Sequence, residues 1–285
     1  MSFLHRAPRA PRVDLTGRRI VVTGATPGSL GGETARVLTA WGADVVTTTR
    51  SGGSHPLDLS DAASVRTFAT WYGETYGDEL HCLVNNAGVH LDLLGQWKQP
   101  QLVEGEEVHW RTNYLGTLHL TSLLLPALLS TQGARVVTVV SKLHARGRNE
   151  RFTTPGEYSS WDSYGQSKLA LVHATTELQR RHGTMGLAAC SVDPGSVLTG
   201  IAARGLTGHG LLSRIRGALR PIEALALLTP EQGAQTSVLC ASTPDLLPAG
   251  FYAKCRPAAP SAEAADTVVA AELYDRTLSW IGAHA

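Results

Sequence analysis

The sequence predicts an α/β fold of the doubly wound, Rossmann-like type, with a parallel sheet covered by helices on both faces. Two observations carry this prediction. Apolar runs of strand length alternate along the chain with stretches of helical periodicity, which is the pattern of repeated βαβ units. A cluster of glycines follows the first apolar run, and folds of this type bind ligands at the carboxyl ends of their strands.

Each element is predicted from its own pattern. The expected strands are Arg19–Thr23, Asp44–Thr49, Leu80–Asn85, Ala134–Ser141, Gly186–Val192 and Gly250–Ala253. The expected helices are Gly31–Trp41, Asp61–Gly77, Glu104–Ser130, Ser163–His182, Pro230–Ala241 and Glu263–Ile281. Parallel neighbours need right-handed crossovers, so the helices should cover both faces of the sheet.

One connection is too short for this scheme. Only Ser51–Leu57 separates Arg50 from Asp58, whereas a parallel crossover needs roughly a dozen residues or more. We therefore predict that the helix after the second strand is absent. The edge strand that would follow it should be lost or reduced to a short extended piece.

Length and composition limit the classes of protein. Residues 14–285 are predicted to form a single domain, and residues 1–13 a disordered basic tail. A net charge of +1 gives no electrostatic case for a nucleic-acid partner. No apolar stretch reaches 18 residues, so no membrane span is expected. The four cysteines show no C-x-x-C pairing and no signal-peptide core is evident, which favours a cytoplasmic protein.

The glycine cluster after the first strand predicts a phosphate-binding loop. Glycines allow the backbone to turn sharply near a pyrophosphate, and the amino end of the following helix favours negative charge. An ordinary strand–helix turn is the alternative. The candidate cofactor-binding residues of this loop are Gly24, Thr26, Gly28, Ser29, Leu30 and Gly31.

The end of the second strand bears on the choice of cofactor. An Asp or Glu usually stands there when the cofactor has a free ribose 2′-hydroxyl, but here the strand ends in Arg50. An arginine can pair with a 2′-phosphate through a charge-assisted hydrogen bond. This favours NADP(H) over NAD(H), with a plain surface arginine as the alternative.

Tyr164 and Lys168 are the candidate reactive pair. On a helix over Ser163–His182 they are four residues apart and share one face. An ammonium group beside a phenol favours the phenolate, which would let the tyrosine act as an acid or base. An exposed helical pair without a chemical role is the alternative.

Together these features resemble the short-chain dehydrogenase/reductase family over nearly the whole chain. The matching marks are Thr23-Gly24…Gly28…Gly31, Asp58-Leu59, Asn85-Asn86-Ala87-Gly88, Asn113, Ser141, Tyr164…Lys168 and Pro194-Gly195…Thr199. The branch of retinol dehydrogenases and WW-domain oxidoreductases, which mostly uses NADP(H), is similar in three segments. These are Tyr164–Ala170, Thr229–Thr236 and Gly250–Cys255.

The resemblance implies roles for individual residues. Tyr164 would be the general acid/base, Lys168 would lower its pKa and hold the nicotinamide ribose, and Ser141 would bind the substrate oxygen. Asn113 would hold a water that relays protons. Asp58 and Leu59 would meet the adenine. Asn86, Ala87 and Gly88 would line the adenosine ribose, and Pro194, Gly195 and Thr199 would flank the nicotinamide.

The chain departs from the family pattern in its glycine loop. The usual form is Thr-Gly-x-x-x-Gly-x-Gly, whereas here two residues separate Gly28 from Gly31. An insertion at this point would move the helix start away from the phosphates unless Gly31-Gly32 absorbs it.

The segment Ser196–Leu228 is rich in glycine and leucine, which favours a substrate lid and an apolar small-molecule substrate, with simple packing of these leucines against the body of the domain as the alternative. We therefore predict an NADP(H)-dependent oxidoreductase that interconverts an alcohol and a carbonyl, with carbonyl reduction favoured. A dehydratase or epimerase on the same scaffold, and a cofactor-sensing protein, are the alternatives. A homo-oligomer, dimer or tetramer, is expected if Glu104–Ser130 and Ser163–His182 pair across a two-fold axis.

Overall fold

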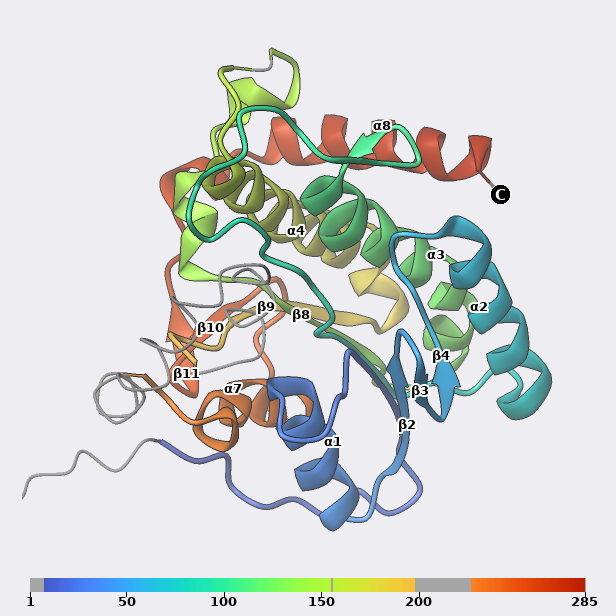
Figure 1. Cartoon of the computed structure of the whole chain (residues 1–285). Coiled ribbons are helices and arrows are strands. Elements are labelled where there is room, and N and C mark those ends of the chain that lie inside the picture. The colour runs from blue at the N-terminus through green and yellow to red at the C-terminus, as the bar shows by residue number, and fades with distance from the viewer. Residues whose placement is uncertain (1–7, 155, 198–226, 285) are drawn as a thin grey trace, which may run out of the picture.

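The predicted doubly wound parallel sheet is confirmed. The computed structural model describes residues 8–154, 156–197 and 227–284. Over these residues the main sheet has eight strands in the order β11-β10-β9-β8-β5-β1-β2-β4 (Figure 1). Every neighbouring pair runs parallel except β10 with β11. The strands are β1 Arg19–Thr23, β2 Asp44–Thr49, β4 His55–Pro56, β5 Cys82–Asn85, β8 Arg135–Val139, β9 Ala188–Asp193, β10 Phe251–Ala253 and β11 Arg256–Ala258.

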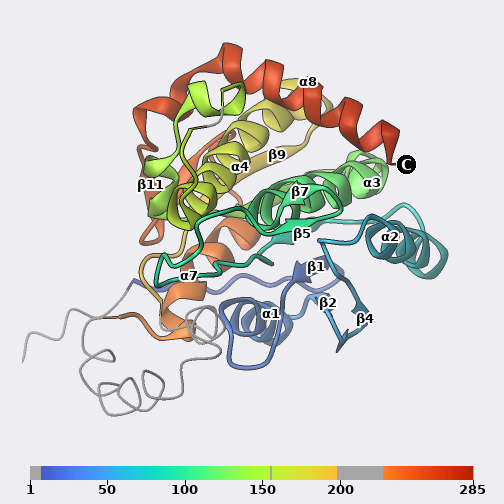
Figure 2. The same ribbon diagram turned by 45° about the horizontal axis from the view of Figure 1, so that its top comes forward.

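Helices cover both faces of this sheet (Figures 1 and 2). On one face lie α1 (Leu30–Ala40) and α7 (Pro230–Ser242), which pack against each other. On the other lie α2 (Ala62–Tyr76), α3 (Gly116–Ser130) and α4 (Ser160–His182), and α8 (Thr267–Ala283) lies along the outside of α4. The helix α7 begins with a capping box, in which Thr229 and Gln232 each bond the other's main-chain N–H.

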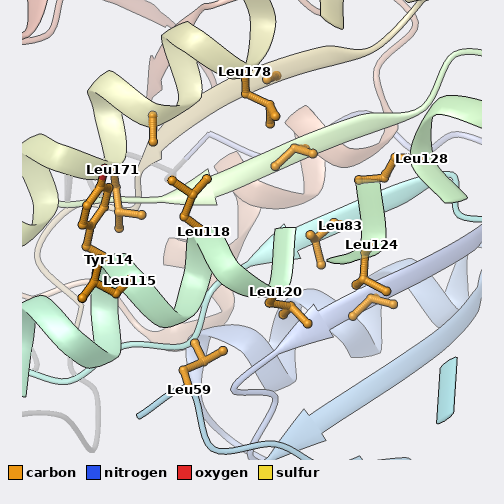
Figure 3. Close-up of a cluster of buried hydrophobic side chains, with 14 of the residues drawn as sticks. Leu59, Leu83, Tyr114, Leu115, Leu118, Leu120, Leu124, Leu128, Leu171 and Leu178 are labelled. Atoms are coloured by element: carbon orange, nitrogen blue, oxygen red, sulfur yellow. The ribbon is translucent and has the colours of Figure 1, made fainter. Parts of the chain in front are cut away.

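The strands build two cores because their side chains alternate between the faces. Ile20 and Val22 of β1 join the core under α1 and α7, whereas Val21 between them joins the core under α2, α3 and α4. Figure 3 shows the second core, where leucines of α3 meet side chains of the sheet and of α4. The inner strands β1, β5 and β8 are buried almost throughout and rich in apolar residues, which made their positions predictable.

The crevice for a ligand lies where the chain changes direction across the sheet. From β1 the chain runs outward to β2 and β4, and from β5 it runs the other way through β8, β9 and β10. The carboxyl ends of β1 and β5 therefore border the switch point at which doubly wound folds bind ligands. Gly24 follows β1, and Asn86 follows β5.

The missing helix after β2 is confirmed, and a tight reversal replaces it. After β2 the chain turns back through β3 (Gly52–Gly53), where the Ser54 N–H donates to the Thr47 carbonyl at 2.7 Å. It then turns again into β4, whose two residues pair parallel with Thr48 and Thr49. Because the chain reverses twice beside β2, this parallel pairing needs no crossover over the sheet.

The predicted helix over Glu104–Ser130 is wrong at its amino end. Glu104 and Gly105 have positive φ angles and form the turn of a hairpin between β6 (Leu102–Val103) and β7 (Glu106–Glu107). The Glu107 carboxylate accepts the N–H groups of His109 and Trp110, both at 2.9 Å, which starts the helix there. A π-helical segment, Trp110–Leu115, then leads into α3.

Both ends of the described chain are packed. Residues 8–13, the described part of the predicted basic tail, lie near α7: the Ala10 N–H donates to Gln235, and Arg9 pairs with Glu231. At the other end α8 packs on α4 through an ion pair of Arg181 with Asp275. This packing accounts for much of the apolar character of α4 within one chain, and the homo-oligomer stays a prediction.

Candidate active site

A cleft of about 670 Å³ opens at the carboxyl ends of the strands and brings most of the candidate residues together. The candidates that line it are Gly24, Thr26, Ser29, Leu30, Gly31, Arg50, Asp58, Leu59, Asn86, Ala87, Gly88, Ser141, Tyr164, Lys168, Pro194 and Gly195. They come from helix α4 and from the segments that follow β1, β2, β4, β5, β8 and β9, which only the fold brings side by side. Gly28 and Asn113 do not line it, and Thr199 and most of the predicted lid lie outside the described residues.

The glycine loop keeps the start of α1 at this cleft despite its extra residue. Ser29 caps the helix by accepting the Gly32 N–H at 3.1 Å, so α1 begins at Leu30. A side chain at Gly31 would meet the Asn86 amide and would lie 2.7 Å from the Gly24 carbonyl oxygen. Because Gly31 has no side chain, the first turn of α1 lies directly against the end of β5. The unpaired N–H groups of that turn are therefore held at the cleft.

Thr23 and Asn86 join the ends of β1 and β5. The Thr23 hydroxyl accepts the N–H groups of Asn86 at 3.0 Å and of Ala87 at 2.9 Å. The Asn86 side chain donates in return to the Thr23 carbonyl at 2.8 Å. These bonds give the floor of the cleft a fixed shape, as a site for an extended dinucleotide requires. With the open helix start beside it, the cleft fits a pyrophosphate-containing cofactor.

The adenosine end of the cleft is formed by the β2–β4 region. Arg50 is exposed at the cleft and Ser51 lines it beside Arg50. One carboxylate oxygen of Asp58 accepts the Ser60 N–H at 2.9 Å and the Ser60 hydroxyl at 2.6 Å. This orients the Asp58 carboxylate at the border of the cleft.

Tyr164, Lys168 and Ser141 meet at the other end. Burial raises the pKa of Tyr164 to about 12, while a hydrogen bond with the Ser141 side chain acts to lower it. Burial also lowers the pKa of Lys168 to about 8. Desolvation is the largest effect on the Tyr164 phenol and favours its neutral form, and the lowering of the tyrosine pKa by Lys168 stays a prediction.

Asn113 holds the backbone that follows β5. Its side-chain oxygen accepts the Val89 N–H at 2.7 Å, and its amide donates to the Val89 carbonyl at 2.9 Å and to Ser167 at 3.1 Å. Asn113 sits in the π-helical segment, a distortion often found at functional sites. It supports the wall of the cleft from behind, close to Gly88.

Sequence reasoning missed further residues of the cleft wall. Thr47 and Thr49 belong to β2 and line the cleft from alternate positions of the strand. Side chains of a strand alternate between its two faces, and this alternation near the strand end could have predicted both residues. Val197, which also lines the cleft, belongs to the predicted lid, and the remaining lining residues that were not predicted are Ala25, Pro27, Gly53, Leu57, Val89, Thr112, Val139 and Val140. Most are small or apolar and carry no chemical signature.

Two absences hold for the described ranges. None of the helices found there is long and apolar enough to cross a membrane. Across the same ranges, no group of three or more His, Cys, Asp or Glu side chains is arranged to hold a metal ion.

Comparison with known proteins agrees with this geometry. Residues 18–207 match the family described as short chain dehydrogenase. Human retinol dehydrogenase 11 is 34% identical over 95% of this chain and 87% of its own length. Mouse polyprenol dehydrogenase is 38% identical over 81% of this chain and 73% of its own. A crystal structure of an uncharacterized protein from Mycobacterium paratuberculosis, 29% identical, superimposes with a TM-score of 0.69 over 94% of this chain and 95% of that one.

The family match and the relatives named as dehydrogenases show an oxidoreductase of the alcohol–carbonyl type. The chain belongs to the short-chain dehydrogenase/reductase family, in its retinol dehydrogenase-like branch.

Proposed function

We propose that this protein is an NADP(H)-dependent oxidoreductase that reduces the carbonyl group of an apolar small molecule, with Tyr164 as the general acid. The observation that carries the proposal is the meeting of Tyr164, Ser141 and Lys168 in the same cleft as the glycine loop. A cofactor along this cleft would have its phosphates at α1 and its reactive end at the tyrosine.

The bound nicotinamide would supply the hydride, and the chain supplies position and a proton. Ser141 would hydrogen-bond the substrate oxygen and orient it. The Tyr164 hydroxyl would donate its proton to that oxygen. A phenol whose pKa is about 12 is protonated at neutral pH, which supports the reductive direction.

Lys168 would act through its ammonium group at the back of the site. Its Nζ donates to the Val139 carbonyl at 3.0 Å and lies 5.8 Å from the centre of the Tyr164 ring. As the tyrosine loses its proton, the nearby positive charge would stabilise the phenolate. The same group would hold the nicotinamide ribose.

Arg50 supports NADP(H) as the cofactor. Its position at the cleft, after the end of β2, suits a 2′-phosphate on the adenosine ribose. Two relatives are named for retinol and polyprenol, which are apolar alcohols, and this supports an apolar substrate.

The first test is a titration of the purified protein with NADPH and NADH, followed by energy transfer from its six tryptophans. We expect NADPH to bind more tightly than NADH, and NADPH oxidation to follow when apolar aldehydes and ketones are added. The Tyr164→Phe variant, which loses only a hydroxyl, should bind NADPH normally and lose turnover. Turnover that persists in this variant would contradict the proposed role of Tyr164.

A further inference from the structure

His90 lies flat against the ring of Tyr164. The centres of the two rings are 4.0 Å apart and their planes differ by 11°. Both side chains are buried, with 5% of His90 and 8% of Tyr164 exposed. The imidazole therefore covers one face of the phenol, and neither the glycine loop nor the tyrosine–lysine motif explains its presence.

The backbone on both sides of His90 is held by side chains. Asn113 bonds both the N–H and the carbonyl of Val89. On the other side the Leu91 N–H donates to Nε2 of His109 at 2.9 Å. The next two residues are tied to α4, since the Ser160 hydroxyl and the Trp161 indole donate to the carbonyls of Asp92 and Leu93.

Other aromatic rings surround the imidazole of His90. The Trp161 ring meets it edge-on with centres 4.6 Å apart, and the His109 ring lies 6.0 Å away. His109 is fixed in turn, because its Nδ1–H donates to the Glu107 carboxylate at 2.8 Å while its Nε2 accepts from Leu91. The position of His90 against Tyr164 is thus determined from several sides.

His90 is neutral in this setting. Burial first, and then the neighbouring His109 and Lys168, lower its pKa to about 4, against a smaller opposite effect of Asp92. Its Nε2 is buried and has no hydrogen-bond partner within the described residues. A buried nitrogen without a partner costs free energy, so packing alone would favour an apolar ring at this position. The charged or titratable side chains that face the pair are Asp92, His109, Lys168 and Asp193.

We propose that His90 is a positioning residue for Tyr164, whose neutral imidazole shields one face of the phenol from water and keeps its hydroxyl directed at Ser141. The inference rests on the acid role of Tyr164 proposed above. Ionisation of a tyrosine costs much less free energy when water reaches its ring and oxygen. The stacked imidazole would therefore preserve the neutral proton donor and limit the orientations of its hydroxyl.

The test compares the ionisation of Tyr164 in variants of His90. Protein labelled with ¹³C at the tyrosine ring carbon that bears the hydroxyl gives one NMR signal per tyrosine, and the Tyr164 signal is the one missing from Tyr164→Phe. In the wild-type protein and in His90→Phe, which keeps a flat ring, this signal should remain that of a neutral phenol up to about pH 10.5. In His90→Ala the signal should begin to move about one pH unit lower or more.

Two further variants keep this test decisive. His90→Asn replaces the alanine variant if that protein does not fold, and its Tyr164 signal should show the same shift of the titration to lower pH. Trp97→Ala removes a ring of the same loop whose centre lies 6.3 Å from that of His109, whereas the rings beside Tyr164 are those of His90 and His109, so the Tyr164 signal should stay unchanged. An unchanged titration in both His90→Ala and His90→Asn would overturn the proposal.

Kinetics separate this proposal from the proposed function. With an active substrate, kcat should fall about tenfold or more in His90→Ala and recover to within about threefold in His90→Phe. If no carbonyl substrate is turned over by the wild-type protein but the NMR displacement appears, the proposed function fails and the positioning of Tyr164 by His90 stands. Equal kcat in the wild-type protein and His90→Ala would overturn the positioning role.

Discussion

The ammonium group of Lys168 lies 5.8 Å from the centre of the Tyr164 ring, inside the protein rather than on a helix surface. Only 4% of the lysine side chain is exposed, and its hydrogen bond goes to the main-chain oxygen of Val139. The pair at positions i and i+4 is therefore a buried pair. Burial of the Lys168 charge affects the stability of the folded protein as well as the chemistry at Tyr164.

Replacement of Lys168 by Met should stabilise the protein at neutral pH and abolish turnover. Burial lowers the lysine pKa from 10.5 to about 8, so the folded chain binds this proton less tightly than the unfolded chain. The resulting penalty is fully present below about pH 8 and disappears as the pH rises toward 10.5. Lys168→Met should gain about 2–3 kcal/mol in urea unfolding at pH 7 and show little gain at pH 10.5. A loss of stability at pH 7 would contradict this account.

Replacement of Arg50 by Glu should change the preference for cofactor. The loss of a charge-assisted bond to the 2′-phosphate, with repulsion added, should weaken NADPH binding by about 10- to 100-fold. NADH lacks that phosphate and should bind with nearly unchanged affinity. The control is Arg256→Glu on β11, which makes the same change of charge at an exposed position away from the cleft. Equal losses for NADPH and NADH in Arg50→Glu would reject the role in 2′-phosphate recognition.

Alanine at Gly31 and alanine at Gly28 should have different effects on the phosphate loop. At Gly31 the new Cβ would meet the Asn86 amide, so the start of α1 must move, at a cost of about 1–3 kcal/mol. At Gly28 nothing lies within 4 Å, but φ is +74°, so the cost is backbone strain of about 1 kcal/mol. NADPH titration and urea unfolding of both variants should show the greater loss of cofactor affinity in Gly31→Ala. Equal affinity in the two variants would show that the contact with Asn86 does not position the loop.

Asn113→Ala should lower both stability and turnover. The change leaves the N–H and the carbonyl of Val89 without their side-chain partner, at a cost of about 1–3 kcal/mol. Because Val89 precedes His90, the wall beside Tyr164 should loosen and kcat should fall. Asn149→Ala is the matched control: its side chain also bridges two segments, from His173 to the Glu263 carbonyl, outside the cleft lining. The control should lose comparable stability and keep its kcat, and a similar fall of kcat in both would indicate a general effect of instability.

The sequence was most predictive where one physical signal determined the structure. Buried parallel strands such as β1 are apolar on both faces, β2 is rich in β-branched residues, and the bounds predicted for Arg19–Thr23 and Asp44–Thr49 agree with β1 and β2. The short Ser51–Leu57 connection predicted the loss of a helix because the chain length allows no crossover. The glycine loop, Arg50 and the Tyr164–Lys168 pair were predicted from the residues themselves, the other candidates were implied by the family resemblance, and most of them line one cleft.

The rest depended on contacts that spacing does not encode. The helix starts later than the apolar pattern suggests because Glu107 accepts the N–H groups of His109 and Trp110, and the β6–β7 hairpin, which turns at Glu104 and Gly105, precedes it. The raised pKa of Tyr164 depends first on how completely the fold buries the phenol, which the spacing of four residues to Lys168 does not encode. His90 belongs to none of the sequence motifs described above, and only the folded chain brings it against the tyrosine ring.

The double reversal of the chain beside β2 also affects how a dinucleotide would enter and leave. In place of a helix and a full-length strand, this border of the cleft has the two-residue strands β3 and β4 and exposed residues at Arg50 and Ser51. Entry of the adenosine end past these residues would require no displacement of a packed helix. Exchange of oxidised for reduced cofactor at this border would then be governed by the ion pair with Arg50, and ionic strength would control the rate of release.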